Sequence, residues 1–469
     1  MVQFPENKTA VSMTRRDVIK AAGAAVAAGA LGSLLPGISF AKEKRPNIVF
    51  ILSDDHRWDH FGVMGHPWIQ TPNLDRLANE GVMFNNAFCT TALCSPSRAS
   101  FISGQYAHKH GVINNLKQWD TKNVTVLELL KQSGYRTGFI GKWHMPGPLP
   151  KLRGVDRFIS FTYKSGQGTH FDCPLVIDGV ETERKGKYLA EDLTDFALDF
   201  IRKDNDDPFC LYLAHKAPHY PFTPPPELKN LYKDKPIDHL PKSAQHRFAS
   251  MVNGEVYGGV LWSVEAKYKK YCSLITSVDQ QVGRVMDELE RLGIADNTIV
   301  IYSTDNGYLW GDKGHFDKRW PYDPALRIPF IVRYPAGIKN PGRRSEEMVL
   351  NVDLAPTLLA MAGVPASREM DGKSIKPLLL NKAVAFRESF YYEFFEDFPP
   401  YTVPGSDAVR SRHYLYIEFN NSRKEPELYD ITKDPENLHN LMGTAVGKEV
   451  LPRLKPLLDD YRRARKNAA

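Results

Sequence analysis

The stretch Asn47-Ile48-Val49-Phe50-Ile51-Leu52-Ser53 is an unbroken apolar run, and two acids, Asp54 and Asp55, follow it directly. A continuous run rich in β-branched and aromatic residues is typical of a strand that is buried on both faces, as in a parallel sheet. Similar runs recur at 136–141, 209–213, 298–303 and 330–334. Helical patterns separate them, the clearest over 271–292 with Gly293 as its C-cap. We therefore expect an α/β fold built on a large, mostly parallel sheet.

Composition narrows the class of protein. The chain has 469 residues, of which 42% are hydrophobic and 25% charged, which excludes disordered, collagen-like and coiled-coil chains. The length predicts one large domain with a smaller one. The net charge of +6 is spread along the chain, so it does not point to nucleic acid. The five cysteines show no CxxC or Cys/His spacing, which argues against a zinc site or a disulfide scaffold.

Residues 1–41 have the organisation of an export signal. A twin-arginine pair, Arg15-Arg16, precedes an Ala/Gly-rich apolar run over 21–35, and Ser39-Phe40-Ala41 forms a small-x-small cleavage site. A membrane anchor is the alternative, but the run is short and ends at Pro36. We predict a Tat-type signal peptide, export through the Tat translocon to the periplasm or the medium, and no integral membrane segment.

The sequence changes character after about residue 376. The stretches 390–394 and 413–419 look like antiparallel strands, and a basic helix near 447–466 closes the chain. We assign residues 42–375 to the main domain and residues 376–469 to a small α+β subdomain with an antiparallel sheet and a terminal helix. The proline-rich stretch 221–226 and the polar region to about 262 are predicted surface loops near the site.

Ionisable side chains follow four of the apolar runs, and in an open α/β sheet ligands bind at the carboxyl ends of the strands. The residues concerned are Asp54, Asp55, Lys142, His144, His215, His219, Asp305 and Asn306. A cap or a turn would explain any one pair, but not all four together. Three carboxylates and an amide oxygen suit Ca²⁺ or Mg²⁺, and nearby cations and histidines suit an anionic substrate. The pattern indicates metal-assisted transfer of a phosphoryl or sulfuryl group.

The pentapeptide Cys94-Ser95-Pro96-Ser97-Arg98 is the most specific feature of the chain. Ser95-Pro96 can open a helix, whose free N–H groups would face an anion, and Arg98 adds a planar fork of donors. Two other interpretations remain open at this point. Cys94 is then either a buried residue beside an ordinary helix start or a plain catalytic thiolate, although no recognisable His and Asn pair accompanies it.

At this pentapeptide the chain resembles the type I sulfatases, whose signature is C-x-P-x-R. Further similarity lies in Thr71-Pro72-Asn73-Leu74-Asp75, Gly141-Lys142-Trp143-His144, Ala217-Pro218-His219 and Ser303-Thr304-Asp305-Asn306-Gly307, and it covers residues 46–440. The resemblance implies an alkaline-phosphatase-like sandwich, with a large mixed, mostly parallel sheet between helices and a small C-terminal α+β subdomain.

The resemblance also implies the chemistry of the site. Cys94 would be oxidised to 3-oxoalanine (formylglycine) by a maturation enzyme, either formylglycine-generating or anaerobic sulfatase-maturating, and the hydrated aldehyde would be the nucleophile. One Ca²⁺ would be held by Asp54, Asp55, Cys94, Asp305 and Asn306. The catalytic set would be Cys94, Arg98, Lys142, His144, His219 and Lys318.

Within that set the implied roles differ. Arg98 and Lys142 would steady the formylglycine and the sulfate. His144 would take a proton from the hydrate, so that the sulfated intermediate collapses. His219 and Lys318 would lie at the sulfate and the leaving oxygen, where a proton is delivered. His215 is predicted to support the site rather than to act in it.

The substrate branch follows from local motifs. Gly314-His315-Phe316-Asp317-Lys318-Arg319-Trp320 and Leu326-Arg327-Ile328-Pro329 look like the N-acetylglucosamine-6-sulfatase branch. This predicts a sulfated carbohydrate, either 6-O-sulfated N-acetylglucosamine or a fragment of a sulfated polysaccharide. Candidates for the sugar-binding mouth are Trp58, His56, His170, Asp172, Arg319 and Trp320, and a core or surface role is the alternative for each. Asp323 departs from the many relatives that carry Glu there.

Two other functions stay open on the sequence. One is a phosphodiesterase or phosphonate monoester hydrolase on the same fold and nucleophile, which comparative turnover of sulfate esters and phosphodiesters would separate. The other is a non-catalytic glycan-binding pseudo-sulfatase. A binding protein has no need to retain a complete catalytic set, so this second alternative is the weaker one.

Overall fold

The computed structural model describes residues 44–147, 149–161, 167–203, 207–241, 264–382, 384–395, 403–420 and 424–468. The predicted signal peptide, residues 1–41, lies outside the described residues, as does the predicted loop from 242 to 262. Residues 45–469 form one compact unit.

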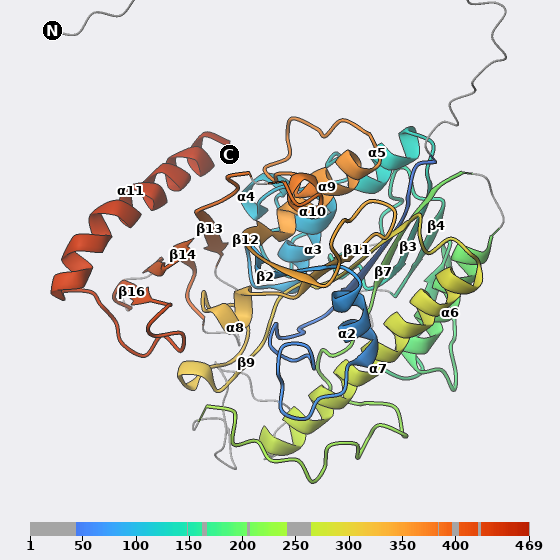
Figure 1. Cartoon of the computed structure of the whole chain (residues 1–469), viewed down its shortest axis with the longest axis horizontal. Coiled ribbons are helices and arrows are strands. Elements are labelled where there is room, and N and C mark those ends of the chain that lie inside the picture. Colours follow the sequence, from blue (N-terminus) through green and yellow to red (C-terminus); the bar gives the residue numbers. More distant parts are fainter. Residues whose placement is uncertain are drawn as a thin grey trace, which may run out of the picture. The chain divides into compact units, whose positions relative to one another are not determined.

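A central sheet organises this unit (Figure 1). In the described part of the chain its strand order is β12-β2-β11-β8-β1-β7-β3-β4-β5-β6. The strands are β1 (Asn47–Ser53), β2 (Val82–Phe88), β3 (Arg136–Gly141), β4 (Arg157–Ser160), β5 (Leu175–Ile177), β6 (Val180–Thr182), β7 (Phe209–Ala214), β8 (Thr298–Thr304), β11 (Phe330–Arg333) and β12 (Arg343–Leu350). The five apolar runs of the sequence are β1, β3, β7, β8 and β11.

The sheet is mixed and mostly parallel around its centre, as predicted. β1 pairs in parallel with both β7 and β8, so Ile48 lies opposite Cys210 on one side and Ile299 on the other. β3 is parallel to β7. β11 is antiparallel to β8 and β2. The four parallel strands therefore end at one edge, whereas the end of β11 points to the opposite edge, and none of the predicted site residues follows β11.

Helices cover both faces of the sheet, which explains why its strands are apolar throughout. Along β1, Ile48, Phe50 and Leu52 pack in one core with α3, α5 and α9, whereas Val49 and Ile51 pack in a second core with α2, α6 and α7. The helices are α2 (Pro72–Asn79), α3 (Cys94–Ser103), α4 (Ala107–His110), α5 (Val126–Gln132), α6 (Leu189–Arg202), α7 (Val264–Arg291), α8 (Asp323–Leu326), α9 (Leu354–Met361), α10 (Lys376–Leu379) and α11 (Ala445–Ala468). α7 covers the predicted helix except for its last residue, Leu292, and begins seven residues earlier.

A small antiparallel sheet lies towards the C-terminus, in the order β13-β14-β15-β16. Its strands are β13 (Ser389–Phe394), β14 (Ser406–Ser411), β15 (Tyr414–Phe419) and β16 (Glu427–Asp430). Alternate residues face opposite ways: Tyr392 joins the core of the main sheet, and Tyr391 packs with Leu454 and Leu458 of α11. Figure 1 shows α11 lying along this sheet. The predicted small sheet and terminal helix are present.

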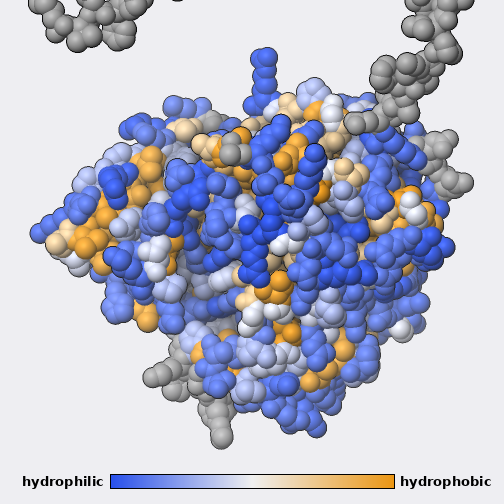
Figure 2. Space-filling model, viewed as in Figure 1, coloured by the Kyte–Doolittle hydropathy of each residue, from blue (hydrophilic) through white to orange (hydrophobic). Residues whose placement is uncertain are grey.

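Short elements complete the chain between β8 and α9. They are β9 (Leu309–Trp310), β10 (Phe316–Asp317) and the 3₁₀ turns η3 (Asp312–Gly314) and η4 (Asn351–Asp353). Among the described residues, no helix has the length and apolar character needed to cross a membrane. Figure 2 shows hydrophilic residues over most of one face, with apolar patches scattered between them.

Candidate active site

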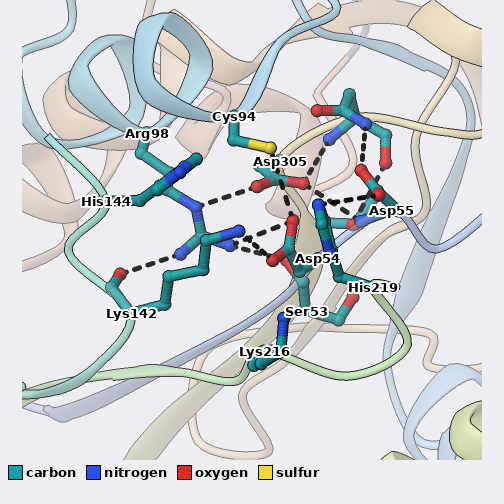
Figure 3. A network of polar contacts seen from close by, with 12 residues as sticks. Ser53, Asp54, Asp55, Cys94, Arg98, Lys142, His144, Lys216, His219 and Asp305 are labelled. Atoms are coloured by element: carbon teal, nitrogen blue, oxygen red, sulfur yellow. Dashed lines mark hydrogen bonds and ion pairs between the residues drawn. The ribbon is translucent and has the colours of Figure 1, made fainter. Parts of the chain in front are cut away.

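The structure brings the predicted catalytic and metal-binding residues together at the edge of the sheet where the parallel strands end (Figure 3). Asp54 and Asp55 follow β1, Lys142 follows β3 and Asp305 follows β8. His219 comes from the segment after β7, and Cys94 is the first residue of α3. All are buried, with exposed fractions of 8% or less. The site is thus a set of charged groups held almost out of water.

Each of the three acidic side chains in this site forms an ion pair with a cationic one. Lys142 forms an ion pair with Asp54. The Lys318 Nζ atom lies 2.6 Å from Asp55 Oδ1, and Arg98 Nε lies 2.8 Å from Asp305 Oδ2. Buried charges are tolerated only when they are compensated in this way.

Cys94 lies at the centre of the pairs. Its Sγ atom is 3.1 Å from Lys318 Nζ and 3.6 Å from Asp54 Oδ1. Burial raises the pKa of the Cys94 thiol to about 12, although Lys142 and Lys318 oppose the shift. At neutral pH an unmodified Cys94 is therefore a neutral thiol, which is a weak nucleophile.

The helix start at Cys94 follows the sequence prediction, with one difference. α3 begins at Cys94 and all ten of its residues are buried. The N–H of Ser95, expected to face an anion, donates instead to Asn115 Oδ1 at 3.0 Å. The fork of Arg98 also reaches the carbonyl oxygen of Lys142 at 2.9 Å. Arg98 therefore ties α3 to the ends of both β3 and β8.

Two histidines, His144 and His219, flank the cluster and differ in their hydrogen bonds. His144 Nδ1 is buried and has no hydrogen-bond partner among the described residues. His219 Nδ1 lies 2.6 Å from the carbonyl oxygen of Tyr220, so it carries a proton, and its Nε2 lies 3.5 Å from Asp55 Oδ2. Burial lowers the pKa of both histidines. Each ring keeps a nitrogen that can exchange a proton with a ligand.

The oxygen atoms at this edge fit a hard cation. Ligand atoms of Asp54, Asp55, Cys94 and His219 all lie within 4.8 Å of one another. Asn306 Nδ2 donates to Asp55 Oδ1 at 2.7 Å, and Asn306 Oδ1 is buried with no hydrogen-bond partner among the described residues. A buried carbonyl oxygen without a donor beside carboxylates is a position that a cation would satisfy.

The carboxyl groups of Asp54 and Asp55 differ in pKa, although both are buried in this cluster. Burial raises the pKa of Asp55 to about 7, although Lys318 opposes the shift, and Asp54 adds to it. For Asp54, burial also acts to raise the pKa, but Lys142, His219 and Arg98 outweigh it, and the pKa lies well below its usual range. Asp54 is thus the carboxylate most firmly held in its charged form.

The backbone at the site is strained at two positions. Asp55 and His144 both have a left-handed conformation, with φ of 68° and 58°, which is uncommon outside glycine. The hydroxyl of Tyr271, on α7, donates to the carbonyl of Asp55 at 2.7 Å and accepts from the N–H of Arg57 at 2.8 Å. Tyr271 thereby holds the turn after β1 in place, a role with no signal in the sequence.

Two further polar residues at the site were not predicted. Gln167 Oε1 accepts a hydrogen bond from Lys142 Nζ at 3.0 Å. Lys216 is buried, its Nζ donates to the carbonyl of Tyr220 at 2.9 Å, and burial together with the charge of Lys142 lowers its pKa to about 7. Lys216 stands between His215 and His219 in the sequence, and this position could have indicated that it lies at the site.

The residues suggested for the sugar-binding mouth lie in varied places. His56 is buried and bonded to Tyr302 and to the carbonyl of His60, so it supports the core. His170 Nε2 lies 2.9 Å from the carbonyl of His219. The Arg327 guanidinium covers the ring of Trp58 at 3.6 Å.

The other three differ again. Arg319 is paired with Asp317, Trp320 is stacked on His315, and Asp172 Oδ1 accepts from the N–H of Gly186.

Two residues singled out in the sequence now have a structural setting. Both ring nitrogens of His215 are buried without a hydrogen-bond partner among the described residues, and burial lowers its pKa to about 4. Asp323 binds Arg410 through both carboxylate oxygens, at 2.9 and 2.8 Å. The shorter acid at this position therefore joins α8 to β14.

Comparison with known families gives two matches. The sequence model of the family described as "Sulfatase" matches residues 46–364. A second, described as "N-sulphoglucosamine sulphohydrolase, C-terminal", matches residues 311–464. Among curated proteins, the N-acetylglucosamine-6-O-sulfatase of Bacteroides thetaiotaomicron is 31% identical over an alignment that covers 90% of this chain and 87% of the relative.

Solved structures agree on the fold. A structure of an enzyme in complex with its substrate D-glucosamine-2-N,6-O-disulfate is similar with a TM-score of 0.80 and 30% identity, covering 90% of this chain and 99% of the other. The phosphonate monoester hydrolase of Agrobacterium radiobacter is similar with a TM-score of 0.73 but only 22% identity, covering 90% and 96%.

Proposed function

The chain belongs to the sulfatase family and is a sulfuric ester hydrolase, and from this premise we propose that it removes the 6-O-sulfate from N-acetylglucosamine or from a fragment of a sulfated polysaccharide. The observation that carries the proposal is the convergence of Cys94 with three acids and three cations in one buried cluster. The relative from Bacteroides thetaiotaomicron and the disulfated glucosamine in the similar structure support the choice of sugar.

We assign one Ca²⁺ to the oxygen atoms of Asp54, Asp55, Asp305 and Asn306, together with the side chain at position 94. The Asn306 Oδ1 atom, which no described residue contacts by a hydrogen bond, supports this assignment. We leave His219 out of the ligand set, because Ca²⁺ prefers oxygen ligands. A bound cation supplies positive charge that stabilises the sulfuryl oxygens as charge develops on them.

We propose that Cys94 becomes formylglycine through a maturation enzyme. The hydrated aldehyde supplies a hydroxyl as nucleophile and a second hydroxyl that allows the ester to break down. Around it, Arg98 and Lys142 hold and orient the sulfate group. Both cations are close enough to do so, because each is paired with a carboxylate of the cluster that surrounds Cys94. The position of Lys318 Nζ, 3.1 Å from Cys94 Sγ, supports a role for this amine at the sulfate oxygens.

The two histidines divide the proton transfers. His144, whose Nδ1 has no hydrogen-bond partner among the described residues, accepts the proton of the second hydroxyl. His219 keeps Nδ1–H on the Tyr220 carbonyl, so Nε2 must first take up a proton, giving an imidazolium beside Asp55, before it can deliver that proton to the leaving oxygen of the sugar. The carbonyl of Tyr220 therefore fixes both the tautomer and the orientation of His219.

The location of the enzyme and its domains are part of the proposal. We infer that residues 1–41 direct export through the Tat translocon, to the periplasm or the medium. We keep residues 42–375 as the catalytic domain and 376–469 as the smaller subdomain.

The phosphonate monoester hydrolase alternative has weaker support. At 22% identity the similarity to such an enzyme speaks for the fold alone, whereas the similarity to sulfatases extends to the sequence. The pseudo-sulfatase alternative would require the complete catalytic cluster to have no catalytic use.

The test is sulfate release from 6-O-sulfated N-acetylglucosamine by protein produced together with a maturation enzyme. Mass spectrometry of the peptide with Cys94 reports conversion, and Cys94→Ala is the blank. Release that disappears in the blank supports the proposal. Converted protein that releases no sulfate from this sugar, but does so from other sulfated sugars, would overturn the substrate alone. Preferred turnover of a phosphodiester would overturn the assigned reaction.

A further inference from the structure

Lys216 is a buried amine to which the proposed mechanism gives no role. It lies just after β7 and is 1% exposed, and its Nζ atom donates to the carbonyl oxygen of Tyr220 at 2.9 Å. Among the described residues, no carboxylate forms an ion pair with this amine. The three cations of the cluster, Arg98, Lys142 and Lys318, each have such a pair. A buried amine without a carboxylate costs folding free energy, so Lys216 calls for a functional explanation.

The carbonyl oxygen of Tyr220 receives two donors from the same segment. His219 Nδ1–H reaches it at 2.6 Å, beside the amine of Lys216. A carbonyl oxygen has two lone pairs, so both donors can bind at once. The main chain closes the same turn, because the N–H of His219 donates to the carbonyl of Lys216 at 3.0 Å. Lys216 therefore contributes both a main-chain and a side-chain hydrogen bond to the turn that carries His219.

Other hydrogen bonds restrain the main chain of this turn but not the imidazole ring. His170 Nε2 lies 2.9 Å from the carbonyl oxygen of His219. The N–H of Asp54 donates to the carbonyl of Ala217 at 3.2 Å. The ring of His219 is held through its bond to the Tyr220 carbonyl. If that carbonyl rotated away, Nδ1–H would lose its acceptor, and the ring would lose both its tautomer and its direction.

We propose that Lys216 is a positioning residue: by holding the Tyr220 carbonyl, it keeps the ring of His219 aimed at the leaving oxygen of the sugar. This rests on the proposed function, in which His219 delivers a proton to that oxygen. In the view of Figure 3, Lys216 lies at the end of the cluster opposite Cys94. Its hydrogen bond is to a carbonyl of the turn and not to a group beside the thiol. Lys216 therefore affects proton delivery rather than attack on sulfur.

The first experiment varies the leaving group. In converted enzyme, Lys216→Met removes the amine and keeps an unbranched side chain. The sugar leaves as a strongly basic alkoxide that needs a proton, whereas 4-nitrophenyl sulfate releases a weakly basic phenolate that does not. We expect kcat for 6-O-sulfated N-acetylglucosamine to fall about tenfold at unchanged KM, and kcat for the aryl sulfate to change less than about twofold. Equal losses on both substrates would overturn the proposal.

Comparison variants show whether Lys216 acts through His219. His219→Gln should show the same selective loss, and a larger one. Lys216→Met added to His219→Gln should lower kcat for the sugar no further, because effects that pass through one group are not additive. Full additivity would contradict the proposal. Lys142→Gln should slow both substrates alike, since Lys142 holds the sulfate. Lys229→Met, which removes an exposed amine from the irregular chain after β7, should leave both rates unchanged.

Thermal unfolding shows whether the variant folds. Lys216→Met should be as stable as the wild type or more stable, because it removes a buried amine that has no carboxylate partner among the described residues. If Lys216→Met does not fold, Lys216→Gln takes its place in the same comparison, since it removes the charge but keeps a polar end.

A second measurement needs no turnover and separates this role from the proposed reaction. Nitrogen-15 NMR of histidine-labelled Cys94→Ala protein reports the tautomer of each ring, and His219→Gln identifies the signals of His219. We expect Nδ1–H with Lys216 present and a mixture of both tautomers after Lys216→Met. If converted wild-type enzyme hydrolyses no sulfate ester but the tautomer changes, the proposed function fails and the positioning role remains. If sulfate release is normal and neither the tautomer nor the leaving-group dependence changes, the positioning role alone is wrong.

Discussion

The described residues contain two clusters of metal-ligand side chains, one around Asp54 and Cys94, the other formed by His60, His66 and Cys272. Both are largely buried. In the first, three acids crowd together, and Asn306 Oδ1 has no donor within the part of the chain that the structure describes. In the second, the ring nitrogens have partners, because His60, His66 and His239 all place Nε2 within 2.9 Å of one hydroxyl, that of Tyr268.

The hydrogen-bond donors and acceptors of the histidine cluster can be assigned around the Tyr268 hydroxyl. His60 Nδ1 donates to Asp59 Oδ1 at 2.7 Å, so its Nε2 accepts from the Tyr268 hydroxyl. His66 Nδ1 accepts from the N–H of Ile69 at 3.2 Å, so its Nε2 donates to Tyr268, as does that of His239. One donation and two acceptances use the full capacity of a hydroxyl. A group of ligand-type residues therefore makes a cation site only where one of their acceptor atoms lacks a hydrogen-bond donor. The following experiments test this difference between the two clusters.

The largest expected effect is that of Asp305→Asn in the first cluster. The change keeps the shape of the side chain but removes the charge that faces Arg98, and it weakens the proposed cation site. We expect sulfate release to fall about a thousandfold. Steady-state kinetics of converted enzyme provides the measurement. Asp59→Asn, in the histidine cluster, should keep a rate near that of the wild type, and equal losses in both variants would contradict the distinction.

Removal of metal should have the next largest effect. Chelation should lower activity at least about a hundredfold, because the carboxylates of Asp54, Asp55 and Asp305 would lose their shared cation. Added Ca²⁺ should restore the rate, and metal analysis should find one Ca²⁺ per chain and no zinc. Zinc at one equivalent that is lost in His66→Gln would show that the histidine cluster is also a metal site.

Tyr268→Phe should affect stability rather than catalysis. Without the hydroxyl, His60 Nε2 loses its donor and the other two histidines lose their acceptor, at a cost of about 1–3 kcal/mol. Thermal unfolding should shift down by a few degrees, while kcat stays close to that of the wild type. A stable variant with little activity would show that this cluster serves the reaction directly.

The smallest effect concerns pH. Burial, with His60 and His239 adding to it, lowers the pKa of His66 to about 2. Below the ordinary histidine pKa of about 6.5 the unfolded chain takes up a proton that the folded protein refuses, so stability falls as pH decreases. From pH 6.5 to 5.5 the free energy of unfolding should fall less steeply in His66→Gln, by about 1 kcal/mol per pH unit. Parallel slopes in denaturant titrations would refute this assignment.

Much of the fold follows from local sequence. β1 and β3 have the predicted bounds, because an apolar run between polar ends has few other stable placements in a sheet. The direction of β11 could not be predicted, since a short apolar run reads the same in parallel and antiparallel pairing. β14 was missed because Asp407 and Arg410 interrupt its apolar pattern, and both are buried through ion pairs with Arg465 and Asp323.

The site residues that follow a strand directly could be predicted from the sequence. Those that reach the site through tertiary contacts could not. Asp54, Lys142 and Asp305 each follow a strand, so their meeting at one edge was expected. The hydrogen bonds of Tyr271 and Asn115 join distant segments, and no local pattern announces them. The left-handed backbone of Asp55 and of His144 likewise depends on the packing around them, because most Asp and His residues do not adopt it even though these types are enriched there.

If Cys94 is converted as we propose, the burial of all ten residues of α3 makes the time of that conversion decisive. Once the sheet has closed over this helix, no modifying enzyme can reach its first residue, so the thiol is accessible only while the chain is still being made or is unfolded. Faster folding would then yield more inert protein, not more enzyme. The yield of active molecules then depends on the rate of Cys94 conversion relative to the rate of folding. Slower folding of this region should raise the fraction converted.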